Sequence, residues 1–397
     1  YSSRYSSQQS SPVNGNHLSI IGSADEDNTL EDRSIRFQHQ YKGFENHKIT
    51  SGIEESYYTV RYKTNKLDGS VSNTVVFNQE GFLHAFFLQD QWVPNERWDV
   101  QAGYRVSYYN ELEGFYGSPR LALKYRVRPG LSLETSLGRH HQFVHRLIGE
   151  IMTRGSQRMW IISSRQIPCI SSLNYHTGLN WEKGYYSLSM NGYYRSLNNI
   201  FQFQDSFIPT TTLVNNRTVS NNEIDFGTGT ARGMELLLRK KEGMVSGWIS
   251  YHLNRTKYDF PSLNNGDSFL ANHDKMHEFK SVIMTRIRKW DFTATWVYAS
   301  GRVYTSAENM YVNSGYQIST TGNQNNERLD SIHHLDVSIS RTWQVSPAVI
   351  HTGLSIYNLY DQWNISHKRY NPYTTQLAVT DVAMFGITPM AFVKISF

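Results

Sequence analysis

The sequence lacks the features that mark several common classes of protein. Cys169 is the only cysteine, so no disulfide can form within the chain. No run of about 18 or more apolar residues is present, and a membrane-spanning helix needs one. Residues Tyr1–Tyr5 have neither the charged start nor the apolar core of a secretory signal peptide. The net charge of +5 on 397 residues gives no reason to infer a nucleic-acid partner.

Motifs that carry chemistry are also missing. The chain has no Gly-x-Ser-x-Gly nucleophile elbow, no Cys-x-x-Cys pair and no phosphate-binding glycine loop. Serine and histidine are abundant, but nothing in the sequence pairs a nucleophile with a base. We therefore expect that the protein is not an enzyme and holds no cofactor.

Aromatic residues in alternating patterns are what the sequence does have. They make up 14% of the chain, with 26 tyrosines, yet the mean hydropathy is only −0.53. In Arg97–Asn110, Arg120–Arg128 and Leu131–Gly138, apolar and polar residues alternate one by one. This period of two gives a strand one apolar and one polar face, and it hides the hydrophobicity of a membrane-spanning strand from average hydropathy.

The alternation predicts roughly fifteen strands, most of them joined to a neighbour by a short turn. Besides the three above, the predicted strands include Arg33–Tyr41, His47–Lys63, Leu83–Val93, Tyr185–Phe203, Met234–Lys241, Val245–Asp259, Glu278–Arg288, Trp290–Ser300, Leu335–Val345 and Val349–Asp361. Long polar connections separate some of them: Gln142–Ile170, Gln204–Gly227, Pro261–Lys275, Arg302–Ile332 and Gln362–Val382. Short turns at one end and long loops at the other are typical of transmembrane β-barrels, whose long loops lie outside the cell.

The last residues, Ile387–Phe397, form another segment of approximate alternation and end in an aromatic residue. Bacterial outer-membrane barrels carry such a final strand, which closes the barrel and is read by the assembly machinery. We therefore assign Phe397 to barrel closure and assembly.

A series of short motifs follows along the chain. They are Phe86–Trp92 with Asp-x-Trp, Ser118–Leu121 with Pro-Arg, Gly192–Ile200, Gly229–Leu236 with Gly-x-x-x-Gly-x-Glu, Asn272–His277, Trp296–Gly301 and Ile356–Tyr360. In this order and spacing they resemble the barrel of TonB-dependent outer-membrane receptors, especially those of the Bacteroidetes type. One departure is Met276, which stands where that family often has arginine.

The resemblance implies a barrel of about 22 strands, closed inside by an N-terminal plug domain. We expect an all-β fold, a transmembrane antiparallel β-barrel of outer-membrane type with about 15–16 of those strands and no plug domain in this chain. Residues 1–32 are predicted to be a partial strand and a polar loop at Ser6–Asn16, and residues 33–397 the barrel. Three explanations stay open: part of a larger receptor, the product of a degenerate gene, or a self-closing barrel of about sixteen strands.

Candidate site residues follow from the alternation and from the motifs. The polar face of the strands predicts a set of side chains that face the lumen: Asp99, Gln101, Arg105, Glu134 and Lys394. The motif residues are expected to be architectural rather than ligand-binding: Gly229, Gly233, Glu235, Asp274, His277 and Asn358. The histidines at a predicted loop mouth are weaker candidates for a ligand, and more often such residues are ordinary polar loop positions: His140, His141 and His145.

By resemblance, the function is uptake of a scarce or bulky ligand: a siderophore, haem, glycan, peptide or vitamin. The implied partners are outer-membrane lipid and lipopolysaccharide, the barrel assembly machinery, a surface lipoprotein, and the TonB inner-membrane energy complex, reached through an upstream plug segment. No nucleic-acid partner is expected, and the implied location is the outer membrane. The alternative is a barrel without a plug that acts as a surface receptor or as a structural component of an outer-membrane complex.

Overall fold

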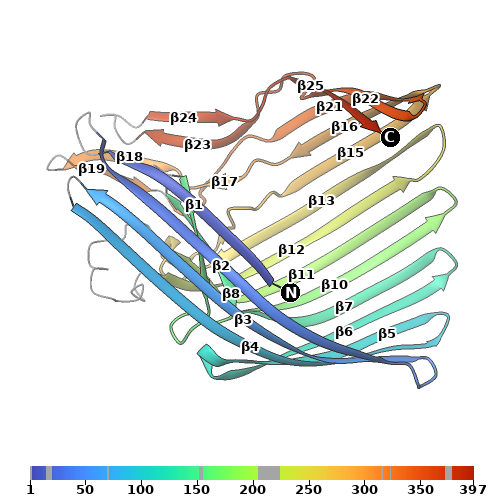
Figure 1. Cartoon of the computed structure of the whole chain (residues 1–397), viewed down its shortest axis with the longest axis horizontal. Coiled ribbons are helices and arrows are strands. Elements are labelled where there is room, and N and C mark those ends of the chain that lie inside the picture. The colour runs from blue at the N-terminus through green and yellow to red at the C-terminus, as the bar shows by residue number, and fades with distance from the viewer. Residues whose placement is uncertain are drawn as a thin grey trace.

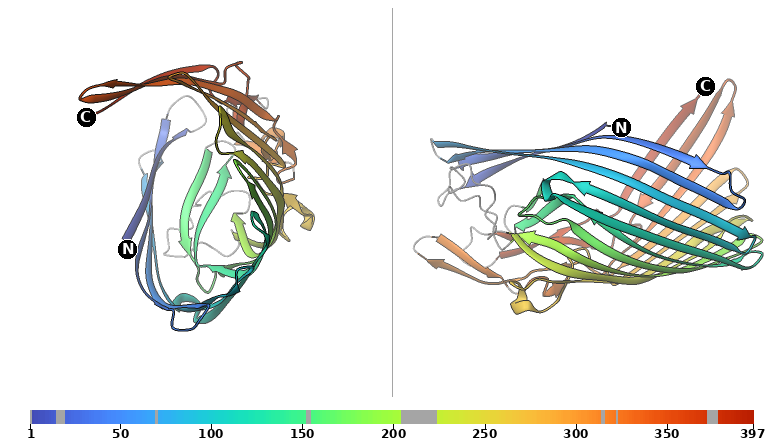
Figure 2. Two further views of the ribbon diagram at one scale, coloured as in Figure 1. Left: turned by 90° about the vertical axis from the view of Figure 1, so that its right-hand side faces the viewer. Right: turned by 90° about the horizontal axis from the view of Figure 1, so that it is seen from below.

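Antiparallel strands make up nearly all of this computed structural model, which describes residues 2–14, 20–68, 71–151, 155–203, 224–313, 316–321, 323–371 and 378–397. One sheet of 17 strands curves through the whole molecule, so that it has a concave and a convex face (Figures 1 and 2). No helix in this part of the chain is long and apolar enough to cross a membrane.

The sheet runs almost entirely in chain order. Its strands are β1 (Ser2–Asn14), β2 (Ile20–Tyr41), β3 (His47–Asp68), β4 (Val71–Asn95), β5 (Trp98–Tyr109), β6 (Gly114–Arg128), β7 (Leu131–Gln142), β10 (Ile170–Lys183), β11 (Tyr186–Phe203), β12 (Ile224–Lys240), β13 (Val245–Asp259), β14 (Phe269–Leu270), β15 (His277–Ile287), β16 (Trp290–Ala299), β21 (Ile332–Val345), β22 (Ala348–Tyr357) and β25 (Thr388–Ser396). Each strand pairs antiparallel with its neighbours, and β7 pairs directly with β10.

Four further strand pairs lie outside this sheet, in its long connections. They are β8 (Val144–Ile151) with β9 (Gly155–Ile162), β17 (Val303–Tyr304) with β20 (Glu327–Arg328), β18 (Ala307–Asn313) with β19 (Tyr316–Thr321), and β23 (Ile365–Asn371) with β24 (Ala378–Ala383). Two short 3-10 helices, at Asn110–Leu112 and Asn264–Gly266, also lie in connections.

The connections at one end of the sheet are all short turns, and every long connection lies at the opposite end (Figure 1). Gly130 joins β6 to β7 and Gly184 joins β10 to β11, with φ of 76° and 56°. These left-handed values are readily adopted by glycine and seldom by other residues, so each residue permits a tight reversal. The predicted asymmetry between short turns and long loops is therefore confirmed.

The alternation in the sequence becomes a division between the two faces of the sheet. Ile53 and Phe86 pair across β3 and β4 and are about half exposed on the convex face. Their sequence neighbours, such as Glu54, point to the concave face, where the β8–β9 hairpin lies (Figure 2). An apolar outer band around a polar interior is the pattern of a transmembrane barrel. The predicted fold class is confirmed.

The structure differs from the sequence prediction in the connections and near the N-terminus. Ser6–Asn14 were expected to be loop but belong to β1, because their backbone groups pair with β2 over the register Ser6–Thr29 to Asn14–Ile20. The boundary at residue 32 stays a prediction. Gln142–Ile170 contains a hairpin instead of an open loop. Residues 204–223 of the predicted loop Gln204–Gly227 lie outside the described residues.

Buried apolar side chains gather on the concave side, next to the β8–β9 hairpin. Ile161 of β9 packs with Tyr62 of β3, with Ile167 and with Ile224 of β12. A second cluster joins Leu83, Tyr109, Phe143 and Cys169. The hairpin is therefore held inside the curve of the sheet by burial of apolar surface.

Candidate functional site

A network of charged side chains joins three strands, β2, β3 and β5, on the concave face. Arg105 of β5 makes two hydrogen bonds to Glu54 of β3, with Nη2–Oε1 at 2.9 Å and Nη1–Oε2 at 3.2 Å. Arg36 of β2 approaches the same carboxylate at 3.5 Å. The Arg105 side chain can reach across β4 because Ala85, which pairs with Glu54, is small and buried. Asp32 of β2 lies on the same face, so two carboxylates accompany the two cations on this part of the face.

The other polar residues predicted for the lumen lie on the same concave face by register. Asp99 and Gln101 lie on the same face of β5 as Arg105, because residues two apart in a strand point the same way. Asp99 accepts two hydrogen bonds from the side-chain amide of Gln91, at 3.0 and 3.2 Å. Glu134 of β7 pairs with Lys124, and its carboxylate lies over Gly178. Lys394 of β25 pairs with His351. The assignment of these side chains to a lumen stays a prediction.

The β8–β9 hairpin spans the concave side between two distant parts of the sheet. The backbone N–H of Trp160 donates to Asn28 Oδ1 of β2 at 2.9 Å, and that of Ile162 donates to Gln79 Oε1 of β4 at 2.9 Å. On the other side of the hairpin, the ring of His145 packs edge-to-face against the ring of Phe201 of β11, with 4.9 Å between the ring centroids. The hairpin is thus a bridge from β2–β4 to β11 (Figure 2).

His145 is buried where this bridge begins. Its ring is 1% exposed, and its Nε2 lies 2.7 Å from the hydroxyl of Ser163. Its Nδ1 has no hydrogen-bond partner among the described residues. Burial lowers the pKa of His145 to about 4, because the charged ring would lose its hydration. The side chain is therefore neutral near neutral pH.

The three candidate histidines do not form a common site. His141 contacts the hydroxyl of Ser118 at 3.1 Å, whereas His145 is bonded to Ser163 in the hairpin. His140 lies beside Gly138. In the part of the chain that the structure describes, no three His, Cys, Asp or Glu side chains come together as a metal ion would require.

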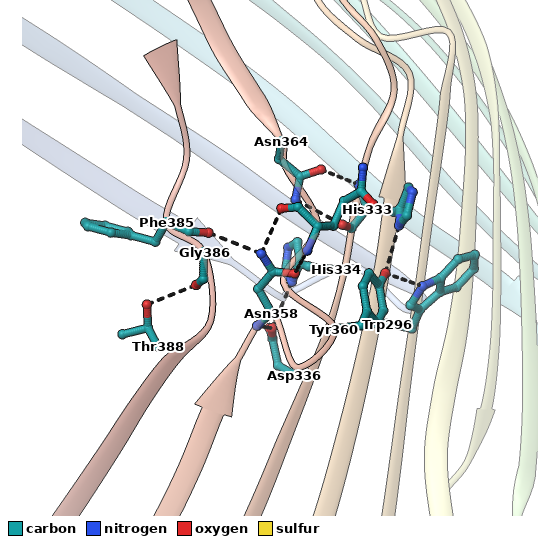
Figure 3. A network of polar contacts seen from close by, with 11 residues as sticks. Trp296, His333, His334, Asp336, Asn358, Tyr360, Asn364, Phe385, Gly386 and Thr388 are labelled. Carbon is teal, nitrogen blue, oxygen red and sulfur yellow. Dashed lines mark hydrogen bonds and ion pairs between the residues drawn. The ribbon is translucent and has the colours of Figure 1, made fainter. Parts of the chain in front are cut away.

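A network of polar contacts ties the loop ends of β21, β22 and β25 together (Figure 3). Asn358 is fully buried and has φ of 52°. Its Nδ2 donates to the carbonyls of Gln362 and Phe385 at 3.0 and 3.3 Å, and its Oδ1 accepts from Gln362 N–H at 3.0 Å. Its own N–H donates to Asp336 Oδ1 at 3.0 Å. Every polar group of this side chain is used inside the protein, which supports an architectural role.

Asn364 fixes the neighbouring turn in the same way. Its Oδ1 accepts from the N–H of His333 at 2.9 Å, and its Nδ2 donates to the carbonyl of His333 at 3.0 Å. The side chain of His333 contacts the hydroxyl of Tyr360 at 2.8 Å, to which Trp296 Nε1 also donates at 3.2 Å (Figure 3). These ties order the rim of the sheet where the loops begin.

The glycines of the Gly-x-x-x-Gly-x-Glu motif stand where neighbouring groups come close. A Cβ on Gly233 would lie 2.6 Å from the carbonyl oxygen of Leu253 and 2.6 Å from the Tyr193 hydroxyl. A Cβ on Gly229 would lie 2.8 Å from the ring of Tyr258. Glu235 of the same motif points to the concave face, 3.6 Å from His252.

Asp274 and His277 of the second motif have separate roles. Asp274 is 1% exposed, accepts from the Thr256 N–H at 2.8 Å and pairs with Arg328 at 2.7 Å. His277 contacts the hydroxyl of Tyr251 at 2.8 Å on the convex face. Phe397, assigned to closure, follows β25 and is 96% exposed.

Sequence reasoning missed the partners of the predicted residues. Glu54 and Arg36 complete the charged network, and Asn28 and Gln79 dock the hairpin. The only sequence signal for Glu54 is its place in the alternation of β3, next to Ile53. For Asn28 there is none, because its partner is a backbone N–H more than a hundred residues away.

A family model described as "TonB dependent receptor-like, beta-barrel" matches residues 1–359 of this chain. The chain belongs to this family. The family is one of outer-membrane barrels, so the convex apolar band and the polar concave face correspond to the lipid-facing and interior faces of such a barrel.

Several solved structures of similar fold are receptors or transporters. The chain is similar to the ferric citrate transporter FecA, with TM-score 0.64 and 12% identity over 94% of this chain and 55% of that one. It is similar to the ferric yersiniabactin uptake receptor FyuA from Yersinia pestis, with TM-score 0.64 and 13% identity over 96% and 56%. The ferripyoverdine receptor of Pseudomonas aeruginosa gives TM-score 0.61 and 10% identity over 99% and 53%.

These likenesses establish the fold. The chain spans about half the length of the structures it matches. No curated relative matches the sequence.

Proposed function

We propose that this chain forms part of the wall of a TonB-coupled outer-membrane receptor that imports a scarce or bulky ligand. The ligand classes considered are a siderophore, haem, a glycan, a peptide and a vitamin. The observation that carries the proposal is the concave face: polar side chains line it, Glu54 joins Arg36 and Arg105 on it, and a hairpin reaches into it.

The route that this geometry supports runs along the concave face, past the β8–β9 hairpin. In the complete receptor this face would line the lumen, with Asp99, Gln101, Arg105, Glu134 and Lys394 as polar contacts for a hydrated ligand. The rim network of Asn358 and Asn364 would hold the loops that meet the ligand first.

The partners proposed here follow from family membership and from the edges of the sheet. Energy would come from the TonB inner-membrane complex through a plug segment, and insertion would use the barrel assembly machinery. Among the described residues, β1 pairs only with β2 and β25 only with β22. Unpaired strand edges are costly in lipid, so we propose that other strands of the complete barrel cover both edges. Bacteroidetes-type membership and a surface lipoprotein partner belong to the same proposal.

A second candidate is a surface receptor or structural component without transport of its own. The observation in its favour is that the β8–β9 hairpin already occupies part of the concave side and is held there by buried contacts. The two candidates differ in whether activity needs energy from the inner membrane.

Uptake assays in cells with and without the TonB complex separate these candidates. Each assay would supply one nutrient from a single defined source. A ferric siderophore or haem would be the sole source of iron, a glycan the sole source of carbon, and vitamin B12 the sole source of that vitamin. Import is expected to need both this receptor and the complex. Uptake through this receptor that proceeds equally without the complex would refute the transporter proposal and favour the second candidate.

A further inference from the structure

A row with two arginines crosses four neighbouring strands of the sheet. Arg120 of β6 pairs with Gly138 of β7. Gly138 pairs on its other side with Asn174 of β10, and Asn174 in turn pairs with Arg195 of β11. These four residues therefore stand side by side at one level of the sheet, and we call them the basic row. Both arginines are exposed.

The basic row lies on the concave face, between the β8–β9 hairpin and the short turns. Its neighbour on β5 is Gly103, which points the same way as Arg105 because alternate residues of a strand share a face. The hairpin lies farther toward the long loops, where His145 packs against Phe201, beyond Arg195 along β11. On the route proposed above, a ligand that has passed the hairpin meets the basic row next.

The contacts within the row leave the charged ends of both arginines available. Arg195 Nε donates to Asn174 Oδ1 at 2.7 Å, which orients the guanidinium through its inner nitrogen. Its terminal nitrogens, and all nitrogens of Arg120, have no hydrogen-bond or ion-pair partner within the described ranges. A Cβ on Gly138 would lie 3.1 Å from His140 Nε2 and 3.6 Å from Arg120 Cγ. The missing side chain of Gly138 thus lets His140 come close enough to interact electrostatically with both arginines.

No carboxylate stands beside these two arginines. The next concave residues of the same four strands are Ser118, His140, Ser172 and Leu197 toward the loops, and Ala122, Ser136, His176 and Tyr193 toward the short turns. The first acidic residue beyond them is Glu134, which pairs with Lys124. Elsewhere on the concave face acids and bases stand together: Glu54 with Arg36 and Arg105, Glu235 with His252, and Glu278 with Lys280. Among the described residues, the basic row is therefore a positive patch without its own counter-charge.

The spacing of the two arginines indicates what could balance them. Three strand spacings separate their Cα atoms, which is about 14 Å. Each guanidinium can bind one carboxylate or phosphate in two-pronged geometry. A ligand with one acidic group can therefore use one arginine fully, whereas a ligand with several can use both.

We propose that the basic row binds a ligand that carries two or more carboxylate or phosphate groups. One acidic group would be held by Arg120 and another by Arg195, which Asn174 keeps oriented. A neutral glycan or an uncharged peptide would leave both arginines without a partner. The inference rests on the proposed function for its role in uptake, and deepens it by naming the charge class of the imported ligand.

The test measures equilibrium binding of small anions to the receptor, purified from outer membranes in mild nonionic detergent and kept at low salt. The probes are tricarballylate and inorganic triphosphate, which carry several acidic groups, and acetate, which carries one. The unmodified receptor is expected to bind one or both polyanions about tenfold more tightly than acetate, and Arg120→Gln and Arg195→Gln are each expected to lose about tenfold of that affinity. Either polyanion supports the proposal, and the tighter one identifies the preferred acidic group.

The matched control is Arg128→Gln/Arg239→Gln, which removes two exposed arginines near the short turns and is expected to leave polyanion binding unchanged. No inner-membrane component takes part in this measurement. Polyanion binding can therefore fail while TonB-coupled uptake is found, and uptake can prove independent of TonB while binding is found. The two proposals are thus tested separately.

A second variant tests the charge of the row without removing an arginine. Asn174→Asp keeps the size of the side chain and the oxygen that accepts from Arg195, but it places a carboxylate within the row. It is expected to weaken polyanion binding by about tenfold, because like charges repel. The control is Asn180→Asp, the same change on the same face of β10 but nearer the short turn, where the side chain accepts from Ser189; binding should be unchanged. Heat-dependent migration on gels verifies that each variant forms its barrel.

Three results would overturn the proposal. One is the lack of measurable binding of both polyanions to the unmodified receptor, or an affinity for acetate equal to theirs. Another is polyanion binding that stays unchanged in both arginine variants and in Asn174→Asp. A third is a lowered thermal midpoint of Arg120→Gln/Arg195→Gln without loss of polyanion binding, which would assign the row to ion pairs with another part of the complete receptor.

Discussion

Acidification is expected to release the β8–β9 hairpin from the concave face before the sheet itself is affected. The reason is His145, whose pKa falls from its ordinary 6.5 to about 4 on burial. In the docked hairpin the ring stays neutral, while in the released hairpin it binds a proton at its ordinary pKa. As pH falls below that ordinary value, the released state takes up protons that the docked state cannot, so the docked state loses stability.

The size of this effect follows from the two pKa values. A change from 6.5 to about 4 corresponds to about 3 kcal/mol between the docked and released states. The loss begins as pH falls through the ordinary pKa and is complete below the lowered one. A protonated ring would also carry an Nδ1–H for which no acceptor is present among the described residues. At neutral pH the full contribution to docking is in place.

Hydrogen exchange read by mass spectrometry measures this release at the amides of Trp160 and Ile162, which donate to Asn28 and Gln79. After correction for the intrinsic rate, protection of β9 is expected to fall as pH is lowered from about 7 to about 4.5. The variant His145→Gln removes the titrating ring and should flatten the profile. Protection that stays constant over this range in the unmodified protein would refute the reasoning.

Three further predictions concern the architecture. Arg328→Met leaves the buried carboxylate of Asp274 unpaired, with an expected loss of about 3–5 kcal/mol; adding Asp274→Asn should restore much of the thermal midpoint, and no recovery would contradict the pairing. Gly247→Ala should block barrel formation on gels, because its Cβ would lie 2.0 Å from the Val282 carbonyl oxygen at a φ of 148°, whereas Gly192→Ala should assemble normally. Asn358→Ala should speed proteolysis of the rim turn by removing hydrogen bonds worth about 1 kcal/mol each; rates equal to those of the unmodified protein would contradict the assigned role.

The register of the strands could be predicted from the sequence because one apolar face fixes which residues point outward. Their limits were predicted less well, since β2, β4 and β12 begin at Ile20, Val71 and Ile224, well before the predicted segments. The segment Arg97–Asn110 contains β5, Trp98–Tyr109, with an error of one residue at each end. A shift of one residue would turn Trp98 and Tyr104 inward and Asp99 and Arg105 outward, so alternation leaves little choice. Asp99, Gln101 and Arg105, which this rule assigns to one face, share one face of β5 in the structure.

The contents of the long connections could not be predicted in the same way. The β8–β9 hairpin is stabilised by residues far along the chain, Asn28, Gln79 and Phe201, and not by a periodic pattern of its own. His145 therefore looked like a residue at a loop mouth, although it is buried. The charged network could not be predicted either, because the contact of Arg105 with Glu54 depends on how β3 and β5 pair with β4 between them.

The way in which the β8–β9 hairpin joins the sheet lets its sequence vary without disturbing the sheet. β7 and β10 pair with each other up to Gln142 and Ile170, so the sheet closes beneath the hairpin without using any of its residues. Insertions, deletions or an entire replacement between those two positions would leave the register of every neighbouring strand intact. The segment between these two positions can therefore be replaced as a unit, which would change the interior of the barrel and leave its wall unchanged. Homologues that take different ligands are expected to diverge most in this segment while keeping the residues that flank it.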